Sequence, residues 1–388
     1  MTKETIVVLS HLPWDFPCDY IKQTSLELAK KAKVVIFNPL DFPTLKNLLI
    51  NKKKREEWLS FFKEKKITYF PSLGIFPFRR FKVIEKLNIW LNLALFRLFY
   101  LLKFGFKKPI FWAFSYQLTE IKNYFSWGRL LVYDRVDQIA SLDPEADKTM
   151  KQEDQQLLKV ADYVFTNSSY ALKYIKKYNK VSFLVPCGYD VDLFLKEKIS
   201  KPREIKRIKK PILGLMGSLD HRLNFKLLFS LAKKRKDWNF VFVGGQFSDD
   251  QAQFRVTNLY HWLRKLEKLP NVYFLGHLPK KQQLVNFVAN FDVCLIPYDI
   301  SLEFVKGSNP MKLYEYLAMG KPVVSTPIQA VKQYSPVVKI AGNAVGFEKA
   351  IEKFLKEGYN KKKEGKRKKI ALENSWEEKV KKMWQQLE

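Results

Sequence analysis

The chain of 388 residues is long enough for two or three domains of ordinary size, which excludes a peptide or a small disulfide-stapled fold. Its residues are 47% hydrophobic and 15% aromatic, which is too apolar for a disordered chain. Sixty-nine Lys and Arg residues against 39 Asp and Glu residues give a formal charge of +30. We therefore expect an anionic partner, either a nucleic acid, a phosphorylated ligand or an acidic membrane.

The positive charge is concentrated in three blocks of the chain. Lys and Arg outnumber Asp and Glu by 16 to 4 in residues 46–108, by 8 to 2 in 196–210 and by 9 to 2 in 353–369. The three cysteines lie far apart and lack the spacing of metal ligands, which indicates reduced thiols and no metal site. The first apolar run is too short for a signal peptide, so we expect a cytoplasmic protein.

Short β-rich runs alternate with helical stretches in the first half of the chain, which is typical of a parallel sheet. Strands are predicted at 6–9, 34–37, 130–133, 163–166 and 181–185, and helices at 20–31, 150–161 and 169–178.

The second half repeats this alternation. Strands are predicted at 212–216, 239–243, 272–275, 293–297 and 322–325, and helices at 224–235, 281–290 and 310–319. Residues 198–210 contain Pro202 and few large apolar residues, so we place a linker there. The predicted fold class is α/β, with two doubly wound, Rossmann-like domains.

Residues 84–108 include the most apolar part of the chain. Their longest uncharged run, 87–96, has ten residues, whereas a membrane-spanning helix needs about 20, so we expect no span. Basic residues flank the segment, which is typical of a helix in the interface of an anionic membrane. A buried helix with solvated ends is the alternative, and the sequence leaves both open.

The stretch SNPMKLYEYLAMGKPVV contains the predicted helix at 310–319. Asn309 is suited to its N-cap and Pro310 to its first position. The unpaired N–H groups of a helix N-terminus can seat a diphosphate, and Lys312 adds a full charge. Glu315 lies about 7.5 Å further along the axis, where it can accept hydrogen bonds from a ribose. An ordinary amphipathic surface helix is the alternative.

The same stretch resembles the donor-binding helix of bacterial nucleotide-sugar-dependent glycosyltransferases of the GT-B fold, the large retaining family and its relatives in teichuronic acid and xanthan assembly. GSLDHRLNFKLL, WNFVFVGG, LPNVYFLGHLP and FDVCLIPY follow that family in order and spacing, and VYDRVDQ, VADYVFTNS and VPCGYDVDLF resemble its N-terminal half. The resemblance implies two domains facing each other across a cleft. It places an acceptor-binding domain at 1–197, a nucleotide-sugar-binding domain at 211–371, and at 372–388 a helix that returns to the first domain.

The resemblance also implies a donor site. Its residues would be Gly217, Ser218, Arg222, His277, Leu278, Ser308, Asn309, Pro310, Met311, Lys312 and Glu315. Gly217 and Ser218 would form the loop under the diphosphate, Arg222 would balance the leaving phosphates, and Leu278 would meet the base through its backbone. The retaining family has a second Glu where this chain has Gly307, which leaves the donor sugar and the stereochemical outcome open.

The implied reaction builds negative charge on a departing phosphate, which two cations and a helix dipole can stabilise without a metal. Asp137 follows a predicted strand at the edge where parallel sheets bind ligands, so we expect it to act as general base in an inverting enzyme. His11, Trp14 and Asp15 are candidates for the acceptor side. A capping histidine and a packed tryptophan are the alternatives there.

These observations predict a metal-independent glycosyltransferase, peripheral on the inner face of the cell membrane. Its expected partners are a UDP-sugar, a lipid-linked or polysaccharide acceptor and an anionic membrane surface, with no nucleic acid, metal or further cofactor. Two other functions stay open. One is a basic, aromatic-rich nucleic-acid-binding protein, although no recognition module is visible, and the other is a GT-B-fold UDP-sugar epimerase.

Overall fold

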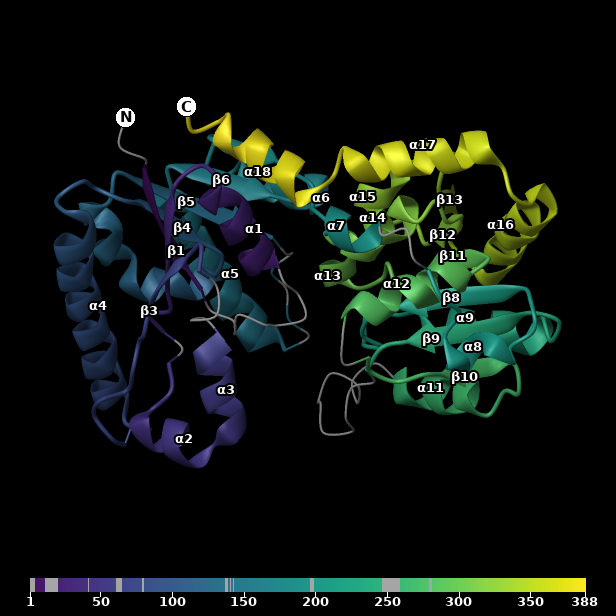
Figure 1. The fold of residues 1–388 in the computed structure, drawn as a ribbon, viewed down its shortest axis with the longest axis horizontal. Coiled ribbons are helices and arrows are strands. Elements are labelled where there is room, and N and C mark those ends of the chain that lie inside the picture. The colour runs from purple at the N-terminus through teal and green to yellow at the C-terminus, as the bar shows by residue number, and fades with distance from the viewer. Residues whose placement is uncertain are drawn as a thin grey trace.

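The computed structural model shows two α/β domains side by side (Figure 1). It describes residues 4–10, 20–40, 42–60, 65–78, 80–136, 139, 141, 143–195, 199–245, 259–278 and 281–388. Each domain is built on one wholly parallel sheet, so the predicted fold class is confirmed.

The first sheet has seven strands in the order β3-β2-β1-β4-β5-β6-β7. Their bounds are β1 Thr5–Leu9, β2 Lys33–Phe37, β3 Thr68–Phe70, β4 Ile110–Ala113, β5 Leu130–Arg135, β6 Tyr163–Thr166 and β7 Ser182–Leu184. The sequence prediction contains neither β3 nor β4. All four residues of β4 are buried, and a short apolar run that follows an apolar segment cannot be told from buried helix by periodicity.

The helices of the first domain begin at local signals. Their bounds are α1 Tyr20–Ala29, α2 Leu45–Ile50, α3 Lys52–Ser60, α4 Lys82–Phe104, the 3-10 helix η2 Tyr116–Trp127, α5 Pro144–Val160, α6 Ser169–Ile175 and α7 Val191–Phe194. Asp143 caps α5 by accepting a hydrogen bond from the Ala146 N–H, and Pro144 occupies the first turn. This cap starts α5 before the predicted position at residue 150.

The second sheet has six strands in the order β10-β9-β8-β11-β12-β13. Their bounds are β8 Ile212–Met216, β9 Asn239–Val243, β10 Val272–Phe274, β11 Val293–Ile296, β12 Val323–Ser325 and β13 Lys339–Ile340. The helices are α8 Arg203–Lys206, α9 Phe225–Lys234, α11 Leu259–Glu267, α12 Lys281–Asn290, α13 Glu303–Lys306, α14 Met311–Ala318, α15 Gln329–Lys332 and α16 Ala344–Glu357. The short α8 lies within the predicted linker, where Ile205 is buried.

The last two helices cross from one domain to the other. Figure 1 shows α17 (Lys361–Leu372) along the second domain and α18 (Trp376–Trp384) over the first, next to α1. Lys379 of α18 forms a buried ion pair with Asp134 of β5, with 3.3 Å between Nζ and Oδ2. Burial raises the pKa of the Asp134 carboxyl, and Lys379 opposes that shift. Asp134 therefore has a structural role at the contact between α18 and the first sheet.

Helix α4 has two unlike faces. Its inner face packs on the sheet, where the Phe96 ring stacks on Phe37 with 4.1 Å between centroids. Asn92 also faces inward and exchanges two hydrogen bonds with the Leu73 backbone, at 3.0 and 2.8 Å. Asn88 does the same with Phe76, at 2.9 and 3.1 Å. Polar residues are therefore inside, and the outer face is largely apolar.

By length and composition alone α4 is also apolar enough to cross a membrane, contrary to the expectation from its longest uncharged run. However, 33% of its most apolar window is buried in the domain. The packed phenylalanine and the two buried asparagines tie this helix to the fold.

Candidate active site

The predicted donor residues gather where the strand order of the second sheet reverses, between β8 and its neighbour β11. Such switch points leave a crevice at the carboxyl ends of the strands, where α/β proteins bind ligands. Two hydrogen bonds join the loop after β8 to the loop after β11. The Asn224 N–H donates to Pro297 O at 2.8 Å, and the Asp299 N–H donates to Arg222 O at 2.7 Å. Arg222 is thus fixed through its backbone at the switch point.

The side chain of Arg222 is held by Asp220. Its Nε lies 2.9 Å from each carboxylate oxygen of Asp220, its Nη2 contacts Oδ2, and its backbone N–H donates to Oδ1 at 2.9 Å. Burial favours the neutral acid, but Arg222 and Lys312 outweigh it and hold the pKa of Asp220 below its ordinary value. Asp220 was not predicted from the sequence. The pattern that could have revealed it is Asp-His-Arg, in which a carboxylate stands two residues before the cation.

Lys312 approaches the same point from α14. Its Nζ lies 5.3 Å from the centre of the Tyr298 ring, and the Arg222 guanidinium lies 5.7 Å from that centre. A Cβ built on Gly217 would lie 3.1 Å from the Lys312 Nζ, so the loop after β8 and the start of α14 nearly touch. Two cations therefore lie near one aromatic ring, which creates a positive site suited to a phosphate group. Tyr298 was also missed.

The start of α14 differs from the prediction. Pro310, rather than Asn309, occupies the N-cap position, and no side chain caps the helix. Asn309 instead donates from Nδ2 to the Asn167 carbonyl of the first domain at 2.8 Å, and its Oδ1 accepts from Tyr314 at 3.0 Å. A contact across the domains thus takes the side chain that the sequence pattern assigned to capping.

Glu315 is buried, with 7% of its surface exposed, and lies one turn after Lys312. The helix is anchored behind it, since the Met216 N–H at the end of β8 donates to the Tyr316 hydroxyl at 2.9 Å. A buried carboxylate one helical turn from a lysine at a strand switch point is typical of a functional site. An ordinary surface pair of Lys312 and Glu315 does not describe this helix.

Three glycines, Gly217, Gly244 and Gly276, follow neighbouring strands at the carboxyl edge of the second sheet. A Cβ on Gly244 would lie 2.0 Å from the Gly217 carbonyl oxygen, so any side chain at Gly244 would separate the two loops. Hydrogen bonds join Gly217 N–H to Val243 O at 2.9 Å and Gly244 N–H to Gly276 O at 2.9 Å. From the sequence, Gly244 only ends a strand. Its steric role depends on a neighbouring strand.

The other predicted donor residues are mostly more exposed than Glu315. Ser218 and His277 are exposed, and Met311 and Leu278 are partly buried. Ser308 is turned away, since its hydroxyl donates to the Phe304 carbonyl at 3.1 Å. The structure therefore brings Gly217, Arg222 and Lys312 together, places buried Glu315 one turn after Lys312, and bonds the Ser308 hydroxyl to the backbone of α13.

The predicted base Asp137 and the acceptor-side candidates lie outside the described residues, and they stay predictions. The candidates concerned are His11, Trp14 and Asp15. Within the part of the chain that the structure describes, no three His, Cys, Asp or Glu side chains gather as a metal site. Asp190, part of a D-x-D pattern, caps α7 by accepting from the Leu193 N–H at 3.0 Å.

Comparison with known proteins defines the class. Residues 210–357 match the family described as glycosyl transferases group 1. Over the whole chain the fold is that of GT-B glycosyltransferases, as the sequence resemblance implied, and the relatives that the sequence matches are glycosyltransferases. The comparisons favour neither the nucleic-acid-binding protein nor the epimerase.

Individual relatives are distant. The chain is 26% identical over 273 residues to TuaH of Bacillus subtilis, assigned to teichuronic acid biosynthesis as a glycosyltransferase; the match covers 66% of each chain, just under two thirds. Sucrose-phosphate synthase of Thermosynechococcus elongatus has a TM-score of 0.72 at 16% identity, covering 99% of this chain and 98% of that one. Anabaena HepE in complex with UDP-glucose has a TM-score of 0.68 at 14% identity, covering 99% of both chains.

Proposed function

We propose that this protein transfers a sugar from a UDP-sugar to a hydroxyl of a lipid-linked or polysaccharide acceptor, at the cytoplasmic face of the membrane. The observation that carries the proposal is the cluster of Arg222, Lys312 and buried Glu315 at the β8/β11 switch point. The UDP-glucose complex of HepE, which has the same fold, supports the donor class. The similarity to TuaH supports an envelope polymer as acceptor.

The chemistry follows from the charges. When the bond between the sugar and the diphosphate breaks, the leaving UDP gains negative charge. Arg222 and Lys312 stabilise that charge, and because Asp220 holds Arg222 in place, little reorganisation is needed as it develops. The Glu315 carboxylate accepts hydrogen bonds from the hydroxyls of the ribose. We propose that these cations suffice without a metal ion and that Asp137 removes the proton of the acceptor.

A membrane location is proposed from the outer face of α4. This face exposes Val83 by 79%, Trp90 by 64% and Leu102 by 81%, and basic residues surround it. Figure 1 shows α4 on the side of the first domain that is remote from the second, so binding there would leave the donor site free. An enzyme with a lipid-linked acceptor needs such a surface.

The donor proposal is tested by calorimetry of UDP and UDP-glucose with the variant Glu315→Ala. We expect at least tenfold weaker binding, about 1.4 kcal/mol, because the ribose loses its acceptor. Glu377→Ala is the control, since Glu377 is an exposed glutamate of α18. Equal affinity of the Glu315 variant and the wild type would refute the donor site.

A further inference from the structure

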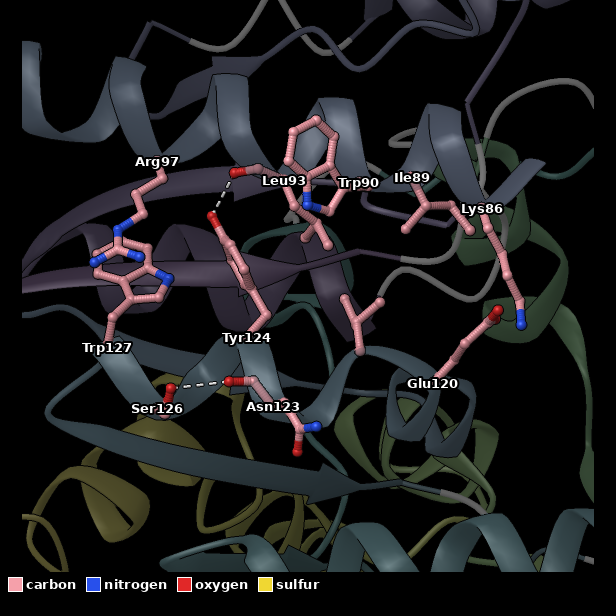
Figure 2. A pocket seen from close by; sticks show the side chains of 11 residues that line it. Lys86, Ile89, Trp90, Leu93, Arg97, Glu120, Asn123, Tyr124, Ser126 and Trp127 are labelled. Carbon is pink, nitrogen blue, oxygen red and sulfur yellow. Dashed lines mark hydrogen bonds between the residues drawn. The ribbon is translucent and has the colours of Figure 1, made fainter. Parts of the chain in front are cut away.

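A groove with a volume of 540 Å³ lies between α4 and η2, on the outer side of the first domain. Figure 2 shows side chains from both helices converging on it. The residues that define its character are Lys86, Trp90, Leu93, Arg97, Tyr124 and Trp127. Its volume is within the range of ligand sites, and it is open to the surface rather than enclosed.

The walls of the groove are held in place. The Tyr124 hydroxyl donates to the Leu93 carbonyl at 2.7 Å, which joins η2 to α4 (Figure 2). The Trp127 ring packs edge-on against Tyr124 and Tyr100, with 5.8 and 5.1 Å between centroids. The groove therefore exists before any ligand binds, so ordering it costs little at binding.

Two cations, Arg97 and Lys86, and one acid are the charged residues that line the groove. The Arg97 guanidinium lies 5.6 Å from the centre of the Trp127 ring. Within the described part of the chain, neither Arg97 nor Lys86 forms an ion pair with a carboxylate. One acid, Glu120, lines the groove at the end near Lys86 (Figure 2). Arg97, at the opposite end, can therefore receive an anion.

The apolar stripe of α4 runs directly beside the groove. Its exposed members follow helical spacing and are Val83, Leu87, Trp90, Leu98 and Leu102. Trp90 belongs to both the stripe and the groove. A ligand in the groove would thus have its polar end at Arg97 and its apolar part against the stripe.

We propose that the groove binds one anionic phospholipid of the membrane, with the phosphate at Arg97 and the first part of an acyl chain along Trp90 and Leu93. The proposal rests on the proposed membrane location and deepens it from general surface attraction to a defined lipid site. Charge complementarity selects this occupant, because the segment 46–108 carries 16 basic residues against 4 acidic ones. A second copy of the chain would bring the same positive charge to the same face.

The first experiment measures binding of a monomeric short-chain phosphatidylglycerol to the full-length protein by calorimetry. We expect one site per chain. Arg97→Gln should weaken it about fivefold, as expected for one cation near a lipid phosphate. Lys103→Gln is the matched control, because it removes the same charge from an exposed position of α4 that does not line the groove. Equal losses in the two variants would overturn the site.

A second variant tests the groove without changing charge. Ser126 is exposed and lines the groove, so Ser126→Trp fills it while leaving the core intact. We expect loss of the short-chain lipid and weaker flotation with phosphatidylglycerol vesicles in about 1 M salt, where exposed charges more than about 3 Å apart are screened. Unchanged lipid binding would refute the proposal. So would glycerol phosphate binding as tightly as the lipid, or dimerisation that the variant abolishes.

Calorimetry with UDP separates this proposal from the donor site. The Arg97 and Ser126 variants should bind UDP like the wild type, since both positions lie on the outer side of the first domain. Lipid binding without UDP binding would refute the donor site alone, and UDP binding without lipid binding would refute the lipid site alone.

Discussion

In the second domain, the charged residues of the donor-side loops are turned toward the protein. Asp220 is almost fully buried and holds Arg222, and Glu315 is buried behind Lys312. Helix α4 of the first domain has the opposite arrangement, with Asn88 buried and apolar side chains in water. The difference indicates two kinds of partner: a small anion that must be surrounded, and an extended surface that must be covered.

The strongest way to break the donor-side arrangement is Gly244→Ala. The new methyl group would lie 2.0 Å from the Gly217 carbonyl oxygen, which forces the loops apart. We expect about 3 kcal/mol of destabilisation in denaturant unfolding, with loss of UDP binding. Gly245→Ala is the matched control, because its Cβ would meet His277 at an ordinary 3.8 Å. Equal stability of both variants would contradict the steric argument.

The buried polar face of α4 is tested by Asn92→Leu. The substitution leaves both the N–H and the carbonyl of Leu73 without their partner, so we expect a loss of about 2 kcal/mol in the free energy of unfolding. UDP affinity should not change, because α4 lies in the other domain. A variant as stable as the wild type would show that the inverted polarity of α4 is not a requirement of the fold.

Asp220→Asn tests whether Arg222 must be held by a charge. We expect about tenfold weaker UDP binding, because the amide cannot keep the bidentate ion pair. Since the pKa of Asp220 lies below its ordinary 3.8, the stability that it contributes is present above pH 3.8 and is lost as pH falls through the lowered pKa. Acid unfolding of the variant should lack this component. Identical acid profiles would contradict the pairing.

The smallest expected change in stability is that of Leu98→Ser on the exposed stripe. Leu98 is 54% exposed, so the free energy of unfolding should change by less than about 0.5 kcal/mol. Flotation with anionic vesicles should nevertheless weaken, because apolar area is lost from the contact with the membrane. Unchanged flotation would show that the apolar stripe of α4 does not contact the membrane.

Local sequence signals were sufficient for the α/β alternation and for the positions of most strands, but they missed several helices, among them α11, α16 and α17. The helix pattern pointed to Lys312 and Glu315, and the family resemblance of the motifs pointed to Gly217 and Arg222; their role in donor binding stays a prediction. The same reasoning failed at Asn309. Its side chain serves as an ideal cap in isolation, yet a carbonyl of the other domain takes its hydrogen bond.

What the sequence determined is therefore whatever depends on near neighbours: periodicity, turns and the spacing of motifs. Tertiary structure alone decided that Arg222 lies near Tyr298 and that Gly244 must lack a side chain, since strands from distant parts of the chain meet there. It also decided which face of α4 is buried. The buried face combines apolar residues such as Phe96 with Asn88 and Asn92, whose hydrogen bonds go to the Phe76 and Leu73 backbones far away in the sequence.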